Sequence, residues 1–256
     1  MRVDIEEKRY GPRIAIKDIH LNSCPGEAIL FLGTSGAGKS TVFKCITGKT
    51  SFKGEISGYK KEDIGYIPQF PALNPEETVF AALFWSGLFS RKYKLWELHK
   101  VTRDLINMLG LSHVQNKKIK NLSGGQRQRV SIGKELIRGN DIIIADEIDT
   151  GLDPGTARGL NKKIVDITHD QKKTTIVISH NLTNINLFDK VVILVKDKTG
   201  AGRIAYFGSV DGMKEFFGTD DYCDVLVGLN LKSENGRGEA DDYIKKFDRM
   251  DNGRIR

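Results

Sequence analysis

This sequence of 256 residues lacks the features that mark secreted, disulfide-bonded and membrane-spanning proteins. Its three cysteines (Cys24, Cys45 and Cys223) are odd in number and form no C-x-x-C pair, so neither a disulfide framework nor a zinc site is indicated. No apolar run approaches the roughly 20 residues that cross a bilayer, and residues 1–6 carry no apolar secretion signal. We therefore expect a cytosolic, globular chain that forms one large domain or two small ones.

The net charge is +7 at pH 7, and the basic residues are dispersed apart from two short runs, at residues 91–94 and 117–120. Tyr93 and Trp96 lie in or beside the first run, and interleaved aromatics of this kind also occur in nucleic-acid-binding proteins. A solvated helix face, or a face turned toward acidic lipid head groups, is the commoner origin of such runs. We expect no nucleic-acid partner.

The strongest signal is the stretch from Gly33 to Ser40, which reads G-T-S-G-A-G-K-S. It fits the phosphate-binding pattern G-x-x-x-x-G-K-[ST], follows the apolar run 28–32 and precedes residues with helical spacing. A strand, a tight glycine turn and a helix N-terminus aim several backbone N–H groups at one point. We expect Lys39 to reach the β- and γ-phosphates of a nucleoside triphosphate and the Ser40 hydroxyl to ligate Mg²⁺.

Periodicity in the first half of the chain predicts strands and then helices. Alternation at residues 13–21 predicts an antiparallel strand, and residues 53–58 and 64–69 predict two short strands. From residue 76 to about 111 the spacing is helical, and Gly110 is placed as a C-terminal cap. A second glycine turn, Leu122 to Gln126, opens another helix that runs to residue 137. The apolar stripe expected to face the core comprises Leu98, Val101, Leu105, Met108 and Leu109.

The second half of the chain predicts buried parallel strands at residues 141–145, 174–179 and 191–195, and a further strand at 204–207. The first of these ends in Asp146 and Glu147, and the second ends at His180. Ligands in α/β sheets bind at the carboxyl ends of the strands. We therefore expect these three side chains near the phosphate loop, with a helix at residues 156–169 between the two strands.

The predicted fold class is α/β: a P-loop NTPase core with a mainly parallel sheet, an N-terminal antiparallel β lobe and an inserted helical lobe. We assign residues 1–231 to this domain, with the helical lobe at about 74–138. Residues 232–256 are polar and charged, and we expect a loose segment that links toward a membrane domain and contains a short helix at 241–250.

In their order along the chain, these motifs resemble one family, the ATP-binding cassette (ABC) ATPases, over roughly residues 5–215. Leu122 to Gln126 reads L-S-G-G-Q, the signature of that family. The resemblance makes Asp146 the aspartate that holds Mg²⁺, Glu147 the residue that polarises the attacking water, and Gln69 and His180 the residues that sense the γ-phosphate. The implied ligands of Mg²⁺ are Ser40, Gln69 and Asp146. The implied ATP-binding residues are Tyr10, Gly33, Thr34, Ser35, Gly36, Ala37, Gly38, Lys39, Ser40, Thr41, Ser123, Gly124, Gly125, Gln126 and Asp153.

Two comparisons with the family refine this prediction. The family usually reads Asp-Glu-Pro-Thr after the strand that carries its acidic pair, whereas this chain has Ile148 and Asp149 in place of Pro-Thr. We expect Asp149 to bring a third carboxylate close to the metal and to retune hydrolysis. Residues 129–136, 150–153 and 203–208 look like the White/pleiotropic-drug-resistance (G-type) branch, in which a membrane domain usually follows the cassette.

The resemblance implies an ATPase that forms a head-to-tail homodimer with two ATP molecules at its interface, because the signature of one subunit completes the phosphate site of the other. We expect the ATP-hydrolysing part of a membrane transporter, an exporter, which acts at the cytoplasmic face with a transmembrane permease as its partner. The alternative is a soluble ABC ATPase of an assembly system, such as an iron–sulfur cluster scaffold, since such cassettes carry the same motifs.

Overall fold

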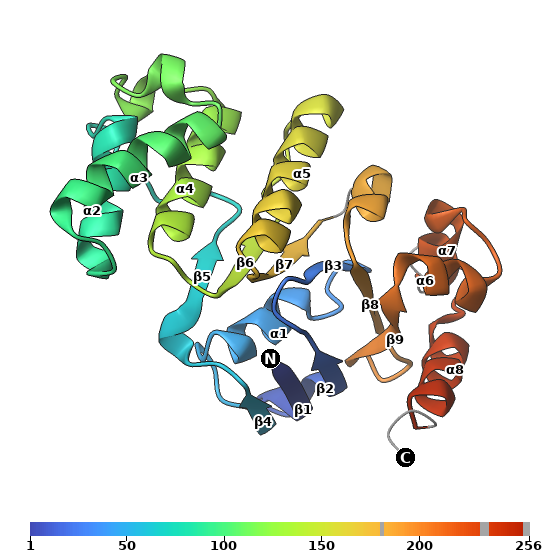
Figure 1. The fold of residues 1–256 in the computed structure, drawn as a ribbon. Helices are drawn as coiled ribbons and strands as arrows, with labels where there is room; N and C mark the ends of the chain where they lie inside the picture. Colours follow the sequence, from blue (N-terminus) through green and yellow to red (C-terminus); the bar gives the residue numbers. More distant parts are fainter. Residues whose placement is uncertain (180–181, 231–235, 253–256) are drawn as a thin grey trace.

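The protein is described by a computed structural model that covers residues 1–179, 182–230 and 236–252 (Figure 1). Within these residues, nine strands form one sheet in the order β4-β1-β2-β9-β8-β3-β7-β6-β5. The strands are β1 (Arg2–Tyr10), β2 (Arg13–Asn22), β3 (Ala28–Gly33), β4 (Lys53–Ser57), β5 (Ile64–Ile67), β6 (Ile142–Asp146), β7 (Thr174–Ile178), β8 (Lys190–Lys196) and β9 (Gly202–Ser209).

Helices lie on both faces of this sheet and at one end of it (Figure 1). The α-helices are α1 (Lys39–Ile46), α2 (Val79–Ser90), α3 (Leu95–Met108), α4 (Gly124–Ile137), α5 (Pro154–Asp170), α6 (Val210–Phe217), α7 (Tyr222–Leu229) and α8 (Ala240–Asn252). Short 3-10 helices occur at Lys61–Asp63, Ser112–Val114, Ile119–Asn121 and Leu182–Leu187.

The sheet has a parallel half and a mixed half, in which β2 and β9 are paired in parallel and the other pairs are antiparallel. β3 lies between β8 and β7 and is parallel to both, and β6 and β5 continue the parallel order beyond β7. β1 pairs antiparallel with β2 and β4, and β8 pairs antiparallel with β9. The runs that are apolar throughout form the buried parallel strands, because helices cover both of their faces. The predicted α/β class, with its antiparallel N-terminal strands, is confirmed.

The core has two layers, one on each face of the sheet, and β3 contributes to both. Leu30 and Leu32 belong to the layer that contacts α5 and the helices beyond it, whereas Ile29 and Phe31 belong to the layer that contacts α1. Successive side chains of a strand point to opposite faces, so one apolar run supplies both layers. This packing fixes the loop that follows β3 at the centre of the molecule.

α2, α3 and α4 pack together beyond the β5–β6 end of the sheet (Figure 1). α2 approaches its neighbours closely, since a Cβ atom on Gly87 would lie 2.4 Å from Leu98 Cδ1. The expected core stripe is wrong at one position: Leu98, Leu105 and Leu109 are buried, but Met108 is 43% exposed. Met108 ends α3, where its side chain lies beyond the surface that the other helices cover.

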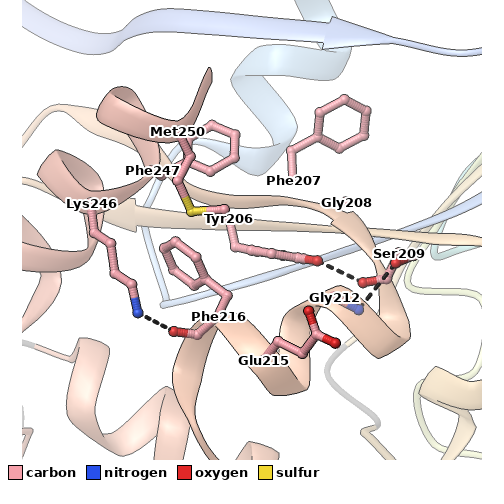
Figure 2. A pocket seen from close by; sticks show the side chains of 10 residues that line it. All are labelled: Tyr206, Phe207, Gly208, Ser209, Gly212, Glu215, Phe216, Lys246, Phe247 and Met250. Carbon is pink, nitrogen blue, oxygen red and sulfur yellow. Dashed lines mark hydrogen bonds between the residues drawn. The ribbon is translucent and has the colours of Figure 1, made fainter. Parts of the chain in front are cut away.

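Helix α8 packs on the sheet, although its sequence is polar. Figure 2 shows Phe247 and Met250 of α8 beside Tyr206 and Phe207 of β9 and Phe216 of α6, around a hollow of about 260 Å³. Lys246 donates a hydrogen bond to the Phe216 carbonyl, Asp248 pairs with Arg203 of β9 at 3.2 Å, and Ile244 is buried. The predicted helix is confirmed, but residues 240–250 are docked on the fold and do not extend loosely. In the described part of the chain, no helix is both long and apolar enough to span a membrane.

Candidate functional site

The loop between β3 and α1 wraps tightly because two strands press against it. A Cβ atom on Gly33 would lie 2.0 Å from the carbonyl oxygen of Leu194 in β8, and one on Gly38 would lie 2.4 Å from Ile16 Cγ2 in β2. Both glycines also have positive φ, at 146° and 94°. Any other residue would clash at these positions and would be strained. The fold of the whole sheet therefore requires glycine at these two places.

This loop borders an open cleft of about 290 Å³. The cleft is lined by Ser35, Gly36, Ala37, Gly38, Lys39, Ser40, Thr41 and Glu147. α1 begins at Lys39 and has no side-chain cap, and the Thr41 N–H already donates to the Gly38 carbonyl at 2.9 Å, so the N–H groups of Lys39 and Ser40 are the ones placed to serve the cleft. The arrangement suits an anion, because the N–H groups and the positive end of the helix dipole act together.

Lys39 is held against the loop. Its Nζ donates hydrogen bonds to the carbonyl oxygens of Gly33, at 2.8 Å, and Thr34, at 3.1 Å, and the residue is only 8% exposed. Burial lowers the pKa of Lys39, and the negative charges of Glu147 and Asp146 oppose that change. The cleft thus has a buried cation on one side and two carboxylates near it.

Asp146 ends β6 and is oriented by a residue from the neighbouring strand. β6 pairs with β5 and β7 in parallel register, which brings the carboxyl ends of the three strands to one edge. Tyr66 of β5 donates a hydrogen bond from its hydroxyl to Asp146 Oδ2 at 2.7 Å. Burial, together with this contact, raises the pKa of Tyr66. Tyr66 therefore remains a donor and fixes the orientation of the carboxylate.

Glu147 lies in the cleft with an unusual backbone conformation. Its φ is 46°, in the left-handed region, and its N–H donates to the carbonyl of Ile178 at 3.0 Å. Gln69 Nε2 donates to Glu147 Oε2 at 2.9 Å. A strained conformation of a non-glycine residue persists only where its surroundings enforce it, and such positions cluster at functional sites. The structure thus brings together Gln69, Glu147, Asp146 and the loop around Lys39.

Asp149, which was expected to lie close to the metal, does not line the cleft. Asp149 is only 7% exposed, and its Oδ2 accepts hydrogen bonds from Ser179, at 2.6 Å, and from Asn161 of α5, at 3.2 Å. In the described residues, which include Asp146, Glu147 and Asp149, no three side chains of the His, Cys, Asp and Glu types are grouped so that they could hold a metal ion. Asp149 instead ties the turn after β6 to α5 and to the end of β7.

The second glycine turn forms the N-terminus of α4 and does not line the cleft. Ser123 Oγ accepts from the Gln126 N–H at 3.2 Å, and Gln126 Oε1 accepts from the Ser123 N–H at 3.0 Å, which completes a capping box. A Cβ atom on Gly124 would meet no atom within 4 Å. Packing within this chain therefore does not require a glycine at that position.

The structure leaves other expected residues away from the cleft. Tyr10 ends β1 with 48% of its surface exposed, and Lys8 Nζ lies 4.7 Å from the centre of its ring. Asp153 caps α5 by accepting from the Thr156 N–H at 3.0 Å, and that hydrogen bond lowers the pKa of Asp153. His180 lies outside the described residues.

Tyr66 is the site residue that the sequence did not reveal. The strand at residues 64–67 was expected, but nothing in the sequence indicates that it lies beside β6 rather than at another position in the sheet. In the structure Ile67 pairs with Ala145 and Tyr66 with Ile144, which brings the phenol within reach of Asp146. The sequence signal for this role was a tyrosine at the end of an apolar strand. The role itself depends on the strand order, which places that tyrosine beside Asp146.

Comparisons with known proteins agree with this geometry. A family model described as ABC transporter matches residues 16–150. The chain is 28% identical over 265 residues to the methionine import ATP-binding protein MetN of Campylobacter jejuni, covering 88% of this chain and 77% of that protein. It is 30% identical over 203 residues to the lipoprotein-releasing system ATP-binding protein LolD of Cytophaga hutchinsonii, covering 73% of this chain and 92% of that protein.

Two further comparisons extend the range of relatives. ABC transporter G family member 14 of Arabidopsis thaliana is 30% identical over 221 residues, which are 80% of this chain and 33% of that protein. The solved structure of cbiO1 from Clostridium perfringens, part of the ABC transporter complex cbiONQ, superposes with a TM-score of 0.72 at 26% identity. The superposition covers 91% of this chain and 96% of that one. The relatives span several branches of one family.

Proposed function

The chain belongs to the ABC transporter family of ATP-binding proteins, which are ATPases, and we propose that it drives a membrane permease through ATP-dependent, head-to-tail dimerisation. The proposal rests on one observation above the others. The phosphate loop and Glu147 line a single cleft, and Asp146 precedes Glu147 at the end of β6, whereas the signature turn at Ser123–Gln126 does not line this cleft.

The cleft would bind the triphosphate of ATP through the loop amides, Lys39, Ser40 and Thr41, and Tyr10 would stack on the adenine. The donors near it fit Mg²⁺, because Ser40 and Asp146 offer hard oxygen atoms and this ion usually takes only one or two protein ligands besides water and phosphate. Gln69 would add a third ligand. When bound, Mg²⁺ would neutralise charge on the phosphates.

In this proposal Glu147 orients the attacking water, since it lines the cleft and is positioned by Gln69. Phosphoryl transfer to water requires mainly positioning and neutralisation of negative charge. Lys39 and the loop amides supply positive charge on one side of the γ-phosphate, and the helix dipole of α1 adds to it. His180 would contact the same phosphate from the end of β7.

In this proposal, a second subunit supplies the signature residues, which do not line the cleft of the same chain. The N–H groups at the start of α4 form a second anion-binding terminus, and Gly124 has no packing role within this chain. A head-to-tail dimer would bring Ser123, Gly124, Gly125 and Gln126 of one copy to the ATP held by the other, and Asp153 would lie at the same interface. Hydrolysis would then separate the two copies.

The proposal also covers the permease partner, the branch of the family and the direction of transport. The relatives include both a G family member and a methionine import protein, so the G-type branch rests on the sequence of residues 129–136, 150–153 and 203–208. We propose export, at the cytoplasmic face of the membrane, with the region around Gln69 and helices α2–α4 as the contact to the permease. Transport into inverted membrane vesicles measures the direction.

Complementation between two inactive variants tests the dimer. K39A disables the phosphate loop and S123R blocks the signature, so each variant alone should lack ATPase activity. In a mixed head-to-tail dimer, one site combines an intact loop with an intact signature. With random pairing, half of the dimers are mixed and half of their sites are complete, so about a quarter of the wild-type rate should return. A mixture that stays inactive at high protein concentration would contradict the arrangement.

Co-purification from native membranes tests the transport role separately. Recovery of the full-length protein with an integral membrane protein supports a transporter. Recovery with soluble assembly proteins alone would instead support the iron–sulfur scaffold alternative, while leaving the complementation result unaffected.

A further inference from the structure

A second pocket, of about 180 Å³, lies between α4 and α5 and shares no lining residue with the ATP cleft. The two helices approach each other at its end, since a Cβ atom on Gly125 would lie 3.4 Å from Leu152 Cδ2. Among the described residues that line this pocket, none is acidic and two are cationic. We call it the α4–α5 pocket, and its lining includes Gly125, Arg129, Leu152, Thr156, Gly159 and Lys163.

The two cations of the pocket, Arg129 and Lys163, meet at the C-terminus of α3. A Cβ atom on Gly110 would lie 3.3 Å from Arg129 Nη1 and 3.5 Å from Lys163 Nζ, so both cations flank the same glycine. Arg129 Nη1 donates to the Leu109 carbonyl at 3.2 Å, and Lys163 Nζ donates to the Met108 carbonyl at 2.8 Å. The C-terminus of a helix attracts cations, which explains why positive charge gathers here.

These contacts use only part of the donors that the two cations offer. An ammonium group has three N–H donors and a guanidinium has five. Over the described residues, Lys163 donates only the bond to Met108, Arg129 adds one long contact from Nε to the Gly125 carbonyl at 3.4 Å, and neither cation pairs with a carboxylate. Burial, together with the charge of Arg129, lowers the pKa of Lys163. The pocket therefore presents two cations that have unused donors and repel each other.

We propose that the α4–α5 pocket binds inorganic phosphate. A tetrahedral oxyanion offers acceptors to Arg129, to Lys163 and to the hydroxyl of Thr156, and hydrogen bonds between charged groups are the strong ones. Its negative charge would also offset the repulsion between the two cations. At about 180 Å³ the pocket is smaller than the ATP cleft, at about 290 Å³, and suits a small ion better than a nucleotide.

The choice of phosphate among small oxyanions rests on the proposed function, because phosphate is a product of ATP hydrolysis. Gly125 belongs to the signature turn that would contact the γ-phosphate held by the second subunit, and it also lines the pocket. Arg129 follows Gly125 by about one helical turn. A phosphate ion released at the signature would therefore meet the two cations of the pocket before it reaches bulk solvent.

Equilibrium dialysis with radiolabelled phosphate tests the proposal on the full chain. Saturating ADP and Mg²⁺ are present throughout, so that the phosphate loop is occupied and the pocket is the site that is measured. We expect saturable binding of one phosphate ion per chain. Sulfate has the same shape and should compete, whereas chloride at the same ionic strength should not.

Two variants locate the bound ion. K163Q should weaken phosphate binding by about tenfold or more, because one hydrogen bond between charged groups is lost, while the amide can still donate to the Met108 carbonyl. K162Q is the matched control, since Lys162 is the exposed neighbour of Lys163 in α5 and does not line the pocket. G159E keeps both cations but places a carboxylate on the pocket wall, four residues before Lys163, where it should pair with Lys163 and displace phosphate. Circular dichroism checks that each variant is folded.

Three results would overturn the proposal. The first is no saturable binding of phosphate by the wild-type chain in the presence of ADP and Mg²⁺. The second is equal weakening by K162Q and K163Q, which would indicate non-specific attraction to a basic surface. The third is wild-type binding in both K163Q and G159E, which would place the ion elsewhere, for example in the ATP cleft. The complementation of K39A with S123R needs no added phosphate, so the proposed function and the phosphate pocket can each fail alone.

Discussion

At the scale of single residues, the phenol of Tyr66 controls the orientation of the Asp146 carboxylate. The hydroxyl donates at 2.7 Å, and its raised pKa keeps the proton on the phenol. Groups that hold a metal-binding carboxylate in place affect metal affinity and activity, although they do not touch the metal. Tyr66 is therefore a positioning residue in the proposed ATPase site.

We predict that Y66F raises the Mg²⁺ concentration for half-maximal ATPase activity by about tenfold, since the carboxylate loses the donor that orients it. A Mg²⁺ titration of the ATPase rate at saturating ATP measures this change. Y59F is the matched control, because the Tyr59 hydroxyl donates to the Ile46 carbonyl in a partly buried site away from the acidic pair. Identical Mg²⁺ curves for both variants would refute the role of Tyr66.

Asp149 has a structural role, so its substitution should lower stability and leave the Mg²⁺ dependence of the ATPase unchanged. D149A removes a buried carboxylate that accepts hydrogen bonds from the Ser179 hydroxyl and the Asn161 amide, so the free energy of unfolding should fall by about 1–3 kcal/mol. D149N keeps an oxygen acceptor and should cost less. Urea denaturation measures both. The Mg²⁺ dependence of the ATPase should match wild type in each variant, and a shifted dependence in D149N would restore Asp149 to the metal site.

At the scale of secondary-structure elements, the N-terminus of α4 carries a glycine that its own fold does not need. Glycine in a helix costs stability relative to alanine, because it loses more conformational freedom on folding. The side chain of an alanine at Gly124 would point into open space. A helix that retains such a glycine is consistent with close approach by something outside the chain, which in our proposal is the ATP of the second subunit.

G124A should therefore separate stability from activity. We predict that it raises the free energy of unfolding by about 0.4–1 kcal/mol and lowers ATPase activity by about tenfold or more, because the methyl group would displace the bound phosphate. G159A is the control: Gly159 is an exposed glycine of α5 that also has open space around its Cα. G159A should gain stability and retain its ATPase rate. Full activity in G124A would argue against a role for the signature turn at the phosphates.

At the scale of the whole molecule, a hydrogen bond connects the segment that leads into the helical part to the ATP cleft. Gln69 lies in the segment that runs from β5 of the sheet toward α2, and it contacts Glu147 at 2.9 Å. A change at the γ-phosphate that moves Glu147 would also move this segment. We infer that α2–α4 respond to the nucleotide through Gln69, which suits a protein that converts hydrolysis into movement.

E147Q should stop this cycle after ATP binding. An amide at this position can still accept from Gln69, but it cannot act as a base, so hydrolysis should fall by about 100-fold or more. The ATP-bound dimer should then accumulate, as size-exclusion chromatography with ATP and Mg²⁺ would measure. Adding K39A to the same chain should abolish the dimer. Equal amounts of dimer in E147Q and in this double variant would contradict nucleotide-driven association.

The sequence alone determined the family and most of the elements, although helices α6 and α7 were not predicted. Apolar runs, glycine turns and capping residues were sufficient to predict the expected strands and helices. They are sufficient because each pattern acts over only a few neighbouring residues. The G-T-S-G-A-G-K-S and L-S-G-G-Q stretches, with Asp146 and Glu147 after an apolar run, were enough to identify the ATPase by its resemblance to the ABC family, since they occur in the order typical of that family.

Only the tertiary structure decided which distant side chains meet. The position of β5 beside β6 brought Tyr66 to Asp146, and the packing of α5 and β7 directed the buried Asp149 carboxylate to Asn161 and Ser179. The docking of α8 and the exposure of Phe89 and Trp96 likewise depend on surfaces supplied by other parts of the chain. Local patterns fix the period and ends of an element, whereas strand order and burial arise from contacts between residues far apart in the sequence.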